Sequence, residues 1–307
     1  MAVQTRGNFA ELSDNIDKTI YTLLFDARKA LPNRWRQTIQ EKKSKKRFER
    51  TLGVVGVGDI PEKGEGAPYT SSILRPGWSK DFLHTEFGLM FEVTQTALED
   101  DQYDQLADHA RWFMFSSHYV EEKRAAILYN NGFSSEQSAD GVSIFNSAHV
   151  LKGGGTARNV PSSASDLTAT SLEQALIDLS TETKVEAGQL VAAPQSLILV
   201  VPPQLEFQAE RVLHSTLRPG SADNDINAMK GARKWKIVVN EFLSDPDAWF
   251  LQDSNLKNLG LVSYSRVGVS MDPAMTDPRT RNRMYPVRWR RSFGCDKWQG
   301  CYGNQGA

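Results

Sequence analysis

Few groups of residues in this sequence have the types and spacing that catalysis or phosphate binding requires. The run Gly56-Val-Gly58-Asp-Ile-Pro61 begins like a dinucleotide-binding fingerprint, but proline occupies the position of the third glycine and no helix is expected to begin there. Lys152-Gly-Gly-Gly-Thr156 has the composition of a phosphate-binding loop, but its lysine precedes the glycines. That motif needs the lysine after the glycines, where it can reach the phosphates. We therefore interpret this run as a turn.

Metal binding and nucleophilic catalysis also lack the residues they need. His84-Thr85-Glu86 matches half of a zinc-deaminase signature, but no Pro-Cys-x-x-Cys follows it. His109 and His118 are nine residues apart on a predicted helix and so lie on roughly opposed faces. Cys295 and Cys301 have no histidine nearby, which predicts reduced thiols and no structural zinc site. No serine lies in a Gly-x-Ser-x-Gly context. We expect no catalytic residue, cofactor or metal, and an active site assembled only by the fold is the alternative.

The composition is that of an ordinary folded protein. The chain has 307 residues, of which 40% are hydrophobic and 24% charged, and a formal net charge of -1. These values exclude wholesale disorder, a collagen-like fibre and a disulfide-rich mini-protein, and they predict no global attraction to nucleic acid or membranes. The longest apolar run, 197–201, is far shorter than the ~20 residues that a bilayer requires, and the N-terminus has no signal-peptide pattern. We expect a cytoplasmic protein of one large domain or two connected domains.

The N-terminal part carries a weak helical pattern followed by a basic run. Within 1–27, apolar residues recur at spacings of three and four: Phe9, Leu12, Ile16, Ile20 and Leu23. This predicts a helix that rests on another surface. The run that follows contains five basic residues within six positions: Lys42, Lys43, Lys45, Lys46 and Arg47. Such a run is either a solvated face or a basic arm that contacts acidic neighbours or phosphates, and the solvated face is the commoner case.

A hairpin with a long loop is expected next. Alternating apolar residues over 87–93 predict a return strand, and 52–57 is the expected outgoing strand. The intervening segment 58–72 has three glycines, two prolines and four charged residues. It has little apolar area to bury, and loops of this length in compact domains are usually functional or disordered. The sequence therefore predicts a protruding loop.

The rest of the chain predicts one long helix and then alternating helices and strands. The helix extends from about 98 to the Asn130-Asn131-Gly132 stop signal, which is longer than a compact domain needs. Residues 133–168 lack periodicity. The final strand, 285–293, has aromatic and aliphatic residues on one face and Arg288 and Arg290 on the other. The elements expected between them are helices over 171–180 and after Pro202-Pro203, and strands over 197–201, 235–239, 249–251 and 261–264.

Three stretches resemble segments of one family. Asp140-Gly-Val-Ser-Ile-Phe-Asn-Ser-Ala-His149 is similar to a D-G-x-x-[LI]-F-x-x-x-H segment, and 199–207 is similar to an L-V-V-P-P-x-L-E segment. Trp298-Gln-Gly-Cys-Tyr-Gly303 resembles a W-x-G-x-Y-G ending, with Cys301 in place of an aliphatic residue. Together with the order of elements, these stretches resemble the Hong Kong 97-type major capsid proteins of tailed bacteriophages, and specifically the Mu-like major head subunits.

The resemblance implies an α+β fold with a particular organisation. Residues 1–45 would be the N-terminal arm, 46–94 an extended hairpin loop, 95–164 and 276–307 a peripheral domain with the long spine helix, and 165–275 an axial domain. The expected intersubunit contacts lie in the loop, at Asp59, Glu62, Lys63, Glu65 and Tyr69. Some relatives crosslink their subunits covalently, and Lys63 lies at the loop tip.

The resemblance also implies the function. The chain would be the major head subunit, self-assembling as hexamers and pentamers into an icosahedral shell around packaged double-stranded DNA, with no sequence-specific or membrane contact. Its basic arm could face the DNA. Because the chain begins almost at the arm, scaffold, protease and portal would be separate proteins. Assembly is expected in the bacterial host cytoplasm. An encapsulin-type nanocompartment shell is the alternative, and a soluble α/β enzyme is a less favoured third.

Overall fold

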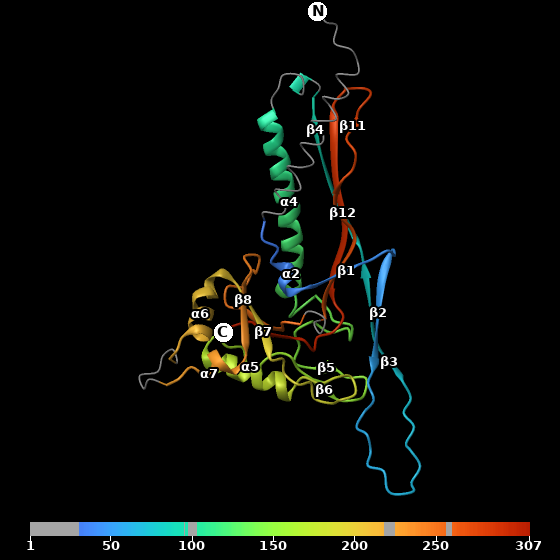
Figure 1. Ribbon diagram of the computed structural model, residues 1–307, viewed down its shortest axis with the longest axis vertical. Helices are drawn as coiled ribbons and strands as arrows, with labels where there is room; N and C mark the ends of the chain where they lie inside the picture. Colours follow the sequence, from blue (N-terminus) through green and yellow to red (C-terminus); the bar gives the residue numbers. More distant parts are fainter. Residues whose placement is uncertain (1–30, 95, 98–102, 218–224, 256–259) are drawn as a thin grey trace, which may run out of the picture. The chain divides into compact units, whose positions relative to one another are not determined.

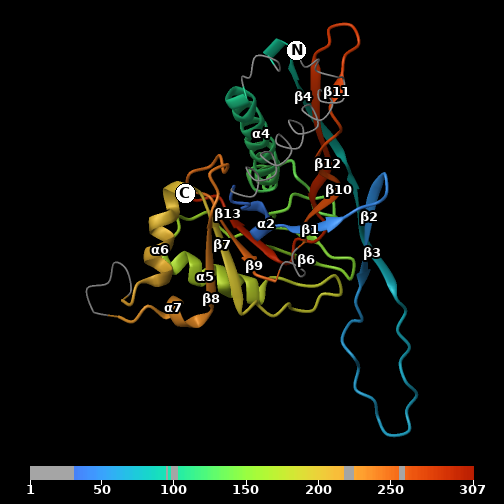
Figure 2. The ribbon, with the colours of Figure 1, turned by 45° about the horizontal axis from the view of Figure 1, so that its top comes forward.

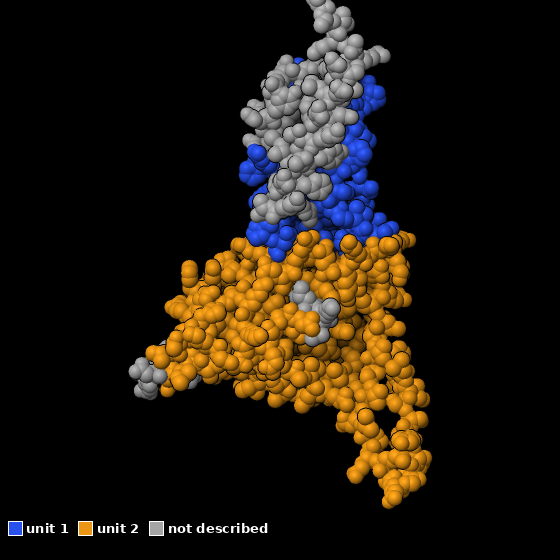
Figure 3. Space-filling view, viewed as in Figure 1, with its two compact units in different colours: residues 1–33, 84–123, 265–291 blue, residues 34–83, 124–264, 292–307 orange. Residues whose placement is uncertain are grey.

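The computed structural model describes residues 31–94, 96–97, 103–217, 225–255 and 260–307, with the side chains of 103–110 excepted. The helix expected within 1–27 lies outside these residues. The chain forms two compact units, coloured separately in Figure 3. Of the described residues, the first contains those within 31–33, 84–123 and 265–291, and the second those within 34–83, 124–264 and 292–307.

The first unit is built on antiparallel strands. Strand β12 (Arg283–Cys295) pairs with β4 (Thr85–Val93) in a register that runs from Arg283 opposite Val93 to Arg291 opposite Thr85. On its other edge β12 neighbours β10 (Leu261–Met271), and β11 (Met275–Thr276) also pairs with β12. The expected alternation is confirmed over 285–290, where Tyr285, Val287 and Trp289 are buried. It ends there, because Arg291 and Ser292 are both buried and Phe293 is only partly buried.

Helix α4 (Tyr103–Asn130) covers this sheet (Figure 1). Its 28 residues correspond to roughly 42 Å of helix. The expected C-terminal end at Asn130 is confirmed, and the expected start at 98 lies outside the described residues. Phe113 packs with Val287 and Trp289, and Met114 packs with Tyr285. One stripe of α4 therefore forms the core of the first unit.

The second unit contains a mixed four-stranded sheet in the order β13-β9-β7-β8 (Figure 2). Strand β7 (Ser196–Val201) is parallel to β8 (Lys234–Val239) and antiparallel to β9 (Trp249–Asp253). Strand β13 (Cys301–Asn304) pairs with β9 at the edge. Because β7 is central and covered on both faces, its sequence is continuously apolar and does not alternate.

Two separate cores lie on the two faces of this sheet. Along β7, Leu197, Leu199 and Val201 belong to one core, and Ile198 and Val200 belong to the other. The first core includes helices α5 (Ala169–Thr181) and α6 (Glu206–His214), the latter preceded by the 3-10 turn η1 (Pro203–Leu205). The second includes helix α2 (Trp35–Thr38) and the end of α4. The short helix α7 (Ala228–Ala232) and hairpin β5 (His149–Val150) with β6 (Thr156–Ala157) complete the unit.

The helix and strand positions expected after residue 165 are confirmed, but the expected pairing of the hairpin is wrong. Strand β2 (Phe48–Val55) pairs with β3 (Arg75–Leu83), and not with the segment over 87–93, which is β4 of the first unit. The sequence obscured β3 because it begins Arg-Pro-Gly-Trp and has no alternating apolar pattern. Both strands of the hairpin are largely exposed, so no buried face imposes that pattern.

Candidate assembly site

The β2–β3 hairpin ends in a long unpaired loop. Val55 opposite Arg75 is the last pair of the ladder, so 56–74 forms the loop, which extends beyond the strands in Figure 1. The predicted loop over 58–72 is confirmed, and the structure lengthens it by two residues at each end. Across the ladder Arg50 donates two hydrogen bonds to Asp81, from Nε (2.5 Å) and Nη2 (2.6 Å). These bonds hold the pKa of Asp81 below its usual value.

A glycine pair bends the hairpin. The register shifts between Leu52 and Val54, which places Gly53 beside Gly77. A Cβ on Gly77 would lie 2.8 Å from the carbonyl carbon of Gly53, so only glycine allows the two backbones to approach this closely. Such a bulge increases the local twist of a strand pair and redirects it.

Next to this bulge the hairpin is attached to the body of the second unit. The indole Nε1 of Trp78 donates to the carbonyl of Val150 (3.2 Å), and the ammonium of Lys152 lies 3.6 Å from the centre of the indole ring. Lys80 donates to the carbonyl of Gln137 (3.0 Å). Sequence reasoning missed this attachment, although a lone tryptophan in a polar strand is a usable signal. These contacts fix the hairpin to the second unit near its bulge.

The predicted loop residues fall into three environments. Asp59 accepts a hydrogen bond from Nε2 of Gln189 (3.1 Å), and the ammonium of Lys63 lies 4.5 Å from the ring centre of Tyr69. Glu62 and Glu65 are exposed to solvent. Five large apolar side chains of the loop are also exposed: Val57 (55%), Ile60 (89%), Tyr69 (87%), Ile73 (81%) and Leu74 (74%). Clustered exposed apolar residues of this kind mark interaction surfaces.

A groove of about 670 Å³ lies between the hairpin and the body of the second unit. One wall is apolar and comes from Leu52, Val54 and Val57 of the hairpin side. The facing wall includes Asp296, whose pKa is raised because its carboxyl is buried. The residues that line the groove include no constellation of groups suited to covalent chemistry.

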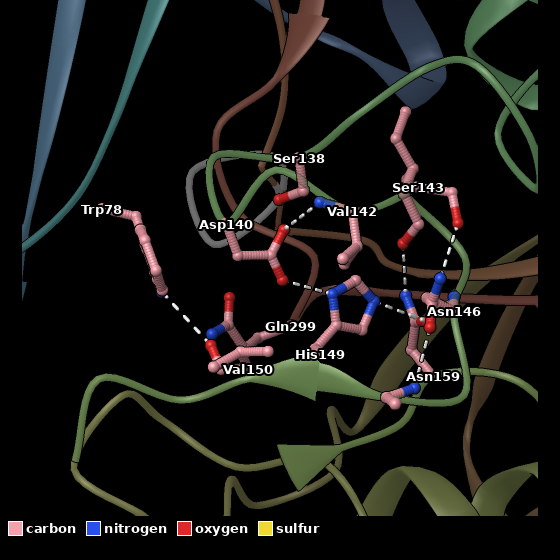
Figure 4. Close-up of polar contacts among 12 residues, drawn as sticks. Trp78, Ser138, Asp140, Val142, Ser143, Asn146, His149, Val150, Asn159 and Gln299 are labelled. Carbon is pink, nitrogen blue, oxygen red and sulfur yellow. Dashed lines mark hydrogen bonds and ion pairs between the residues drawn. The ribbon is translucent and has the colours of Figure 1, made fainter. Parts of the chain in front are cut away.

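A buried histidine, His149, contacts residues of two of the sequence motifs, the segment 140–149 and the segment 298–303 (Figure 4). His149 is fully buried, and its Nδ1 lies 2.6 Å from Oδ2 of Asp140. Its Nε2 lies 3.1 Å from Oδ1 of Asn159. The orientation of the Asn159 amide is fixed, because its Nδ2 donates to the carbonyl of Ile144 and its Oδ1 accepts from the backbone of Asn146. Oδ1 is therefore an acceptor, and Nε2 of His149 must carry a hydrogen.

The C-terminal motif packs against the same cluster. The Trp298 indole stacks on the His149 ring with 4.2 Å between ring centres and an interplanar angle of 6°. The backbone N–H of Gly303 donates to the carbonyl of Asn159 (3.0 Å). A Cβ on Gly303 would lie 2.7 Å from the Phe145 ring, so close packing requires glycine there. The two motifs thus have a structural role, because they hold segment 133–168 against residues 298–303.

The His149–Asp140 pair is not an active site. Both ring nitrogens of the histidine are engaged, and the side chains are 0% and 1% exposed, so no substrate can reach them. Among the described residues, no group of three or more His, Cys, Asp or Glu could hold a metal ion. Lys152-Gly-Gly-Gly-Thr156 forms the turn between β5 and β6, as the sequence predicted, with positive φ at Gly154 and Gly155.

The predicted basic residues surround one turn. Lys42 and Lys43 lie on β1 (Gln40–Lys43), and Lys42 is placed over the ring of Tyr264. Lys45, Lys46 and Arg47 lie in the exposed turn that leads to β2. Glu49 is an ion-pair partner of Lys46 (3.9 Å). The preceding residues are anchored, because Trp35 and Ile39 are buried in a core of the second unit. The basic residues are therefore presented by a folded turn.

A family model described as phage capsid protein matches residues 82–304, which is most of the chain. The chain belongs to the phage capsid protein family. It is a shell subunit of a bacteriophage head and has a structural, non-enzymatic role. No match was found among curated proteins.

Solved capsid structures share the fold of this subunit. The capsid of Cyanophage P-SCSP1u has a TM-score of 0.61 at 8% identity, covering 90% of this chain and 88% of that one. The mature capsid of bacteriophage PhiM1 has a TM-score of 0.59 at 11% identity, with the same coverage. The capsid of an empty GTA particle has a TM-score of 0.53 at 13% identity, covering 90% of both chains.

These comparisons confirm the α+β, Hong Kong 97-like capsid fold that the sequence predicted. A capsid is built from many copies of its subunit, so the principal partner of this chain is other copies of itself. Its place is the virion capsid. No helix among the described residues is long and apolar enough to cross a bilayer. The family assignment also favours a phage capsid over the nanocompartment alternative.

Proposed function

We propose that this subunit forms the hexamers and pentamers of an icosahedral phage head that encloses double-stranded DNA, and that the β2–β3 hairpin makes the contact between neighbouring subunits. The observation that supports this proposal is the exposure of Ile60, Tyr69 and Ile73 on a loop whose base is held by Trp78. A fixed base with an apolar, exposed tip suits a segment that is ordered by a neighbour.

The domain organisation belongs to the same proposal. Residues 1–45 act as an N-terminal arm, 46–94 as the extended loop, 95–164 and 276–307 as a peripheral domain, and 165–275 as an axial domain around the capsomer centre. The core that contains α5, α6 and β7 supports an axial domain, because almost all its residues lie between 167 and 251. The assignment to the Mu-like subdivision rests on the three sequence motifs.

Shortening the loop tests the intersubunit role. In one variant, residues 56–74 are replaced by Asn-Gly, a two-residue turn that can close the ladder between Val55 and Arg75. The subunit should fold, as judged by circular dichroism, but electron microscopy should show no closed shells. A matched control replaces the same residues with Gly and Ser at equal length. If either variant forms normal closed shells, the loop side chains are not needed for assembly and the proposal is wrong.

The shell contents test the DNA part of the proposal. We propose that the exposed lysines and Arg47 contact packaged DNA without sequence preference, because phosphate contacts depend on charge and not on base sequence. Scaffold, protease and portal act as separate proteins, and assembly takes place in the bacterial cytoplasm. Purified particles should contain nuclease-protected DNA. Particles filled with cargo protein would instead identify a nanocompartment.

A further inference from the structure

Three aromatic side chains form an exposed face on α4, named here the aromatic face: Trp112, Phe115 and Tyr119. Their exposed fractions are 69%, 45% and 44%, while the next residues round the helix, Phe113 and Met114, are buried. The ring centres of Trp112 and Phe115 are 5.8 Å apart, and those of Phe115 and Tyr119 are 6.5 Å apart. The rings therefore form one continuous apolar surface, and such surfaces mark interaction sites.

The dimensions and charge of the aromatic face define what would fit on it. From Trp112 to Tyr119 the helix rises about 10 Å, which equals two helical turns. The exposed residues that bound it, Arg111 and Lys123, are both basic, and no acidic residue between 111 and 123 is exposed. A suitable partner is an amphipathic helix with an aliphatic stripe of two or more turns and acidic residues beside that stripe.

The N-terminal segment of the same chain has this pattern in its sequence. Its apolar residues at 9, 12, 16, 20 and 23 share one face of a helix with 3.6 residues per turn. The charged residues closest to that stripe are Asp17 and Asp26, together with Arg6 near the start of the segment, and Lys18 lies on the opposite side. Residues 31–33, which directly follow the segment, belong to the same unit as the aromatic face. Binding of the segment to this unit would therefore be intramolecular, which raises its effective concentration at the aromatic face.

We propose that the N-terminal segment 1–30 binds in cis, as an amphipathic helix, to the aromatic face of its own subunit. Its aliphatic stripe covers Trp112, Phe115 and Tyr119, and its aspartates lie toward Arg111 and Lys123. The basic residues 42–47 then extend from an arm whose preceding part is held on the subunit. This inference is independent of the proposed loop contact, since the two surfaces share no residues.

Disulfide trapping in the full-length subunit tests the contact directly. One variant carries Ile16→Cys with Ser116→Cys, since Ser116 is exposed between Phe115 and Tyr119. The control carries Lys18→Cys with Ser116→Cys, and Lys18 lies on the other side of the predicted helix. The native cysteines are buried and stay in both variants. The first variant should form an intramolecular disulfide at least 10-fold faster than the control. Equal rates, or disulfides that form only between subunits, would overturn binding in cis.

Hydrogen exchange provides a second, independent measurement. In the native subunit, amides of 9–23 should exchange at least 10-fold more slowly than in a variant with Trp112→Ser, Phe115→Ser and Tyr119→Ser. These residues are exposed, so their replacement leaves the core intact. A matched control replaces three exposed apolar residues of the second unit: Leu190, Phe207 and Ile226. The proposal fails if exchange of 9–23 is unchanged in the first variant or accelerates equally in the control.

Discussion

Disrupting the buried His149–Asp140 pair should destabilise the subunit more than any surface change. Two variants remove one partner each while keeping shape. His149→Phe retains a ring against Trp298 but leaves the Asp140 carboxylate, which is 1% exposed, without its 2.6 Å partner. Removing the partner of a buried charge in this way costs about 3–5 kcal/mol. Asp140→Asn can keep a hydrogen bond, because its Nδ2 can take the place of Oδ2 and donate to Nδ1 of His149, but it loses the stronger bond that a carboxylate makes. The expected cost is about 1–3 kcal/mol.

The double variant distinguishes a coupled pair from two independent contacts. The double variant leaves no buried unpaired charge, so the cost should fall below the sum of the single costs by about 2 kcal/mol. Urea unfolding of the full-length subunit, followed by circular dichroism, measures these differences. Additive costs within about 0.5 kcal/mol would refute the coupling that we derive from the geometry.

Three further predictions concern the core, the basic residues and the thiols. Trp289→Ala should destabilise the first unit by about 3–5 kcal/mol, because the indole is 6% exposed and stacks on Phe87; a loss below about 1 kcal/mol in thermal unfolding would contradict this. Replacing Lys42, Lys43, Lys45 and Lys46 with Gln should change subunit stability by only about 0.5 kcal/mol while reducing the DNA retained in shells, and a large fall in the thermal midpoint would contradict it. Burial raises the pKa of Cys295 to about 12 and that of Cys301 well above its usual value. Neither thiol should therefore be alkylated at pH 8 until the subunit is unfolded. Alkylation of the native subunit, measured by mass spectrometry, would contradict this prediction.

Local patterns in the sequence were sufficient to predict a helix or strand wherever the burial of its own side chains sets the pattern. Strand β7 is apolar throughout because both faces of its sheet are covered, and β12 alternates because only one of its faces packs on α4. The end of α4 at Asn130 and the start of η1 at Pro203 follow from the intrinsic preferences of Asn, Gly and Pro. The loop was predictable for the opposite reason, since 58–72 has little apolar area to bury.

Partner choice between strands was decided only by the tertiary structure. The alternating segment at 87–93 fits any strand with an apolar face, and its true partner, β12, follows about 200 residues later. The partner of β2 is the irregular, polar β3, whose register depends on the close approach of Gly53 and Gly77. Neither pairing can be predicted from the local sequence. The hydrogen bonds between strands join backbone N–H and C=O groups, and every residue except proline has both.

The candidate site divides in the same way. Its sequence determined which residues are charged, which loop protrudes, and that Asp140, His149 and Trp298 belong to recurrent motifs. Only the folded chain showed that these three residues meet, with the ring of His149 between a carboxylate, an amide oxygen and an indole. The attachment of the hairpin through Trp78 and Lys152 was likewise set by the fold. His149 lies nine positions from Asp140 in the sequence, but Trp78 lies 72 positions from Val150. At either separation the contact geometry depends on how whole elements pack, which the local sequence does not contain.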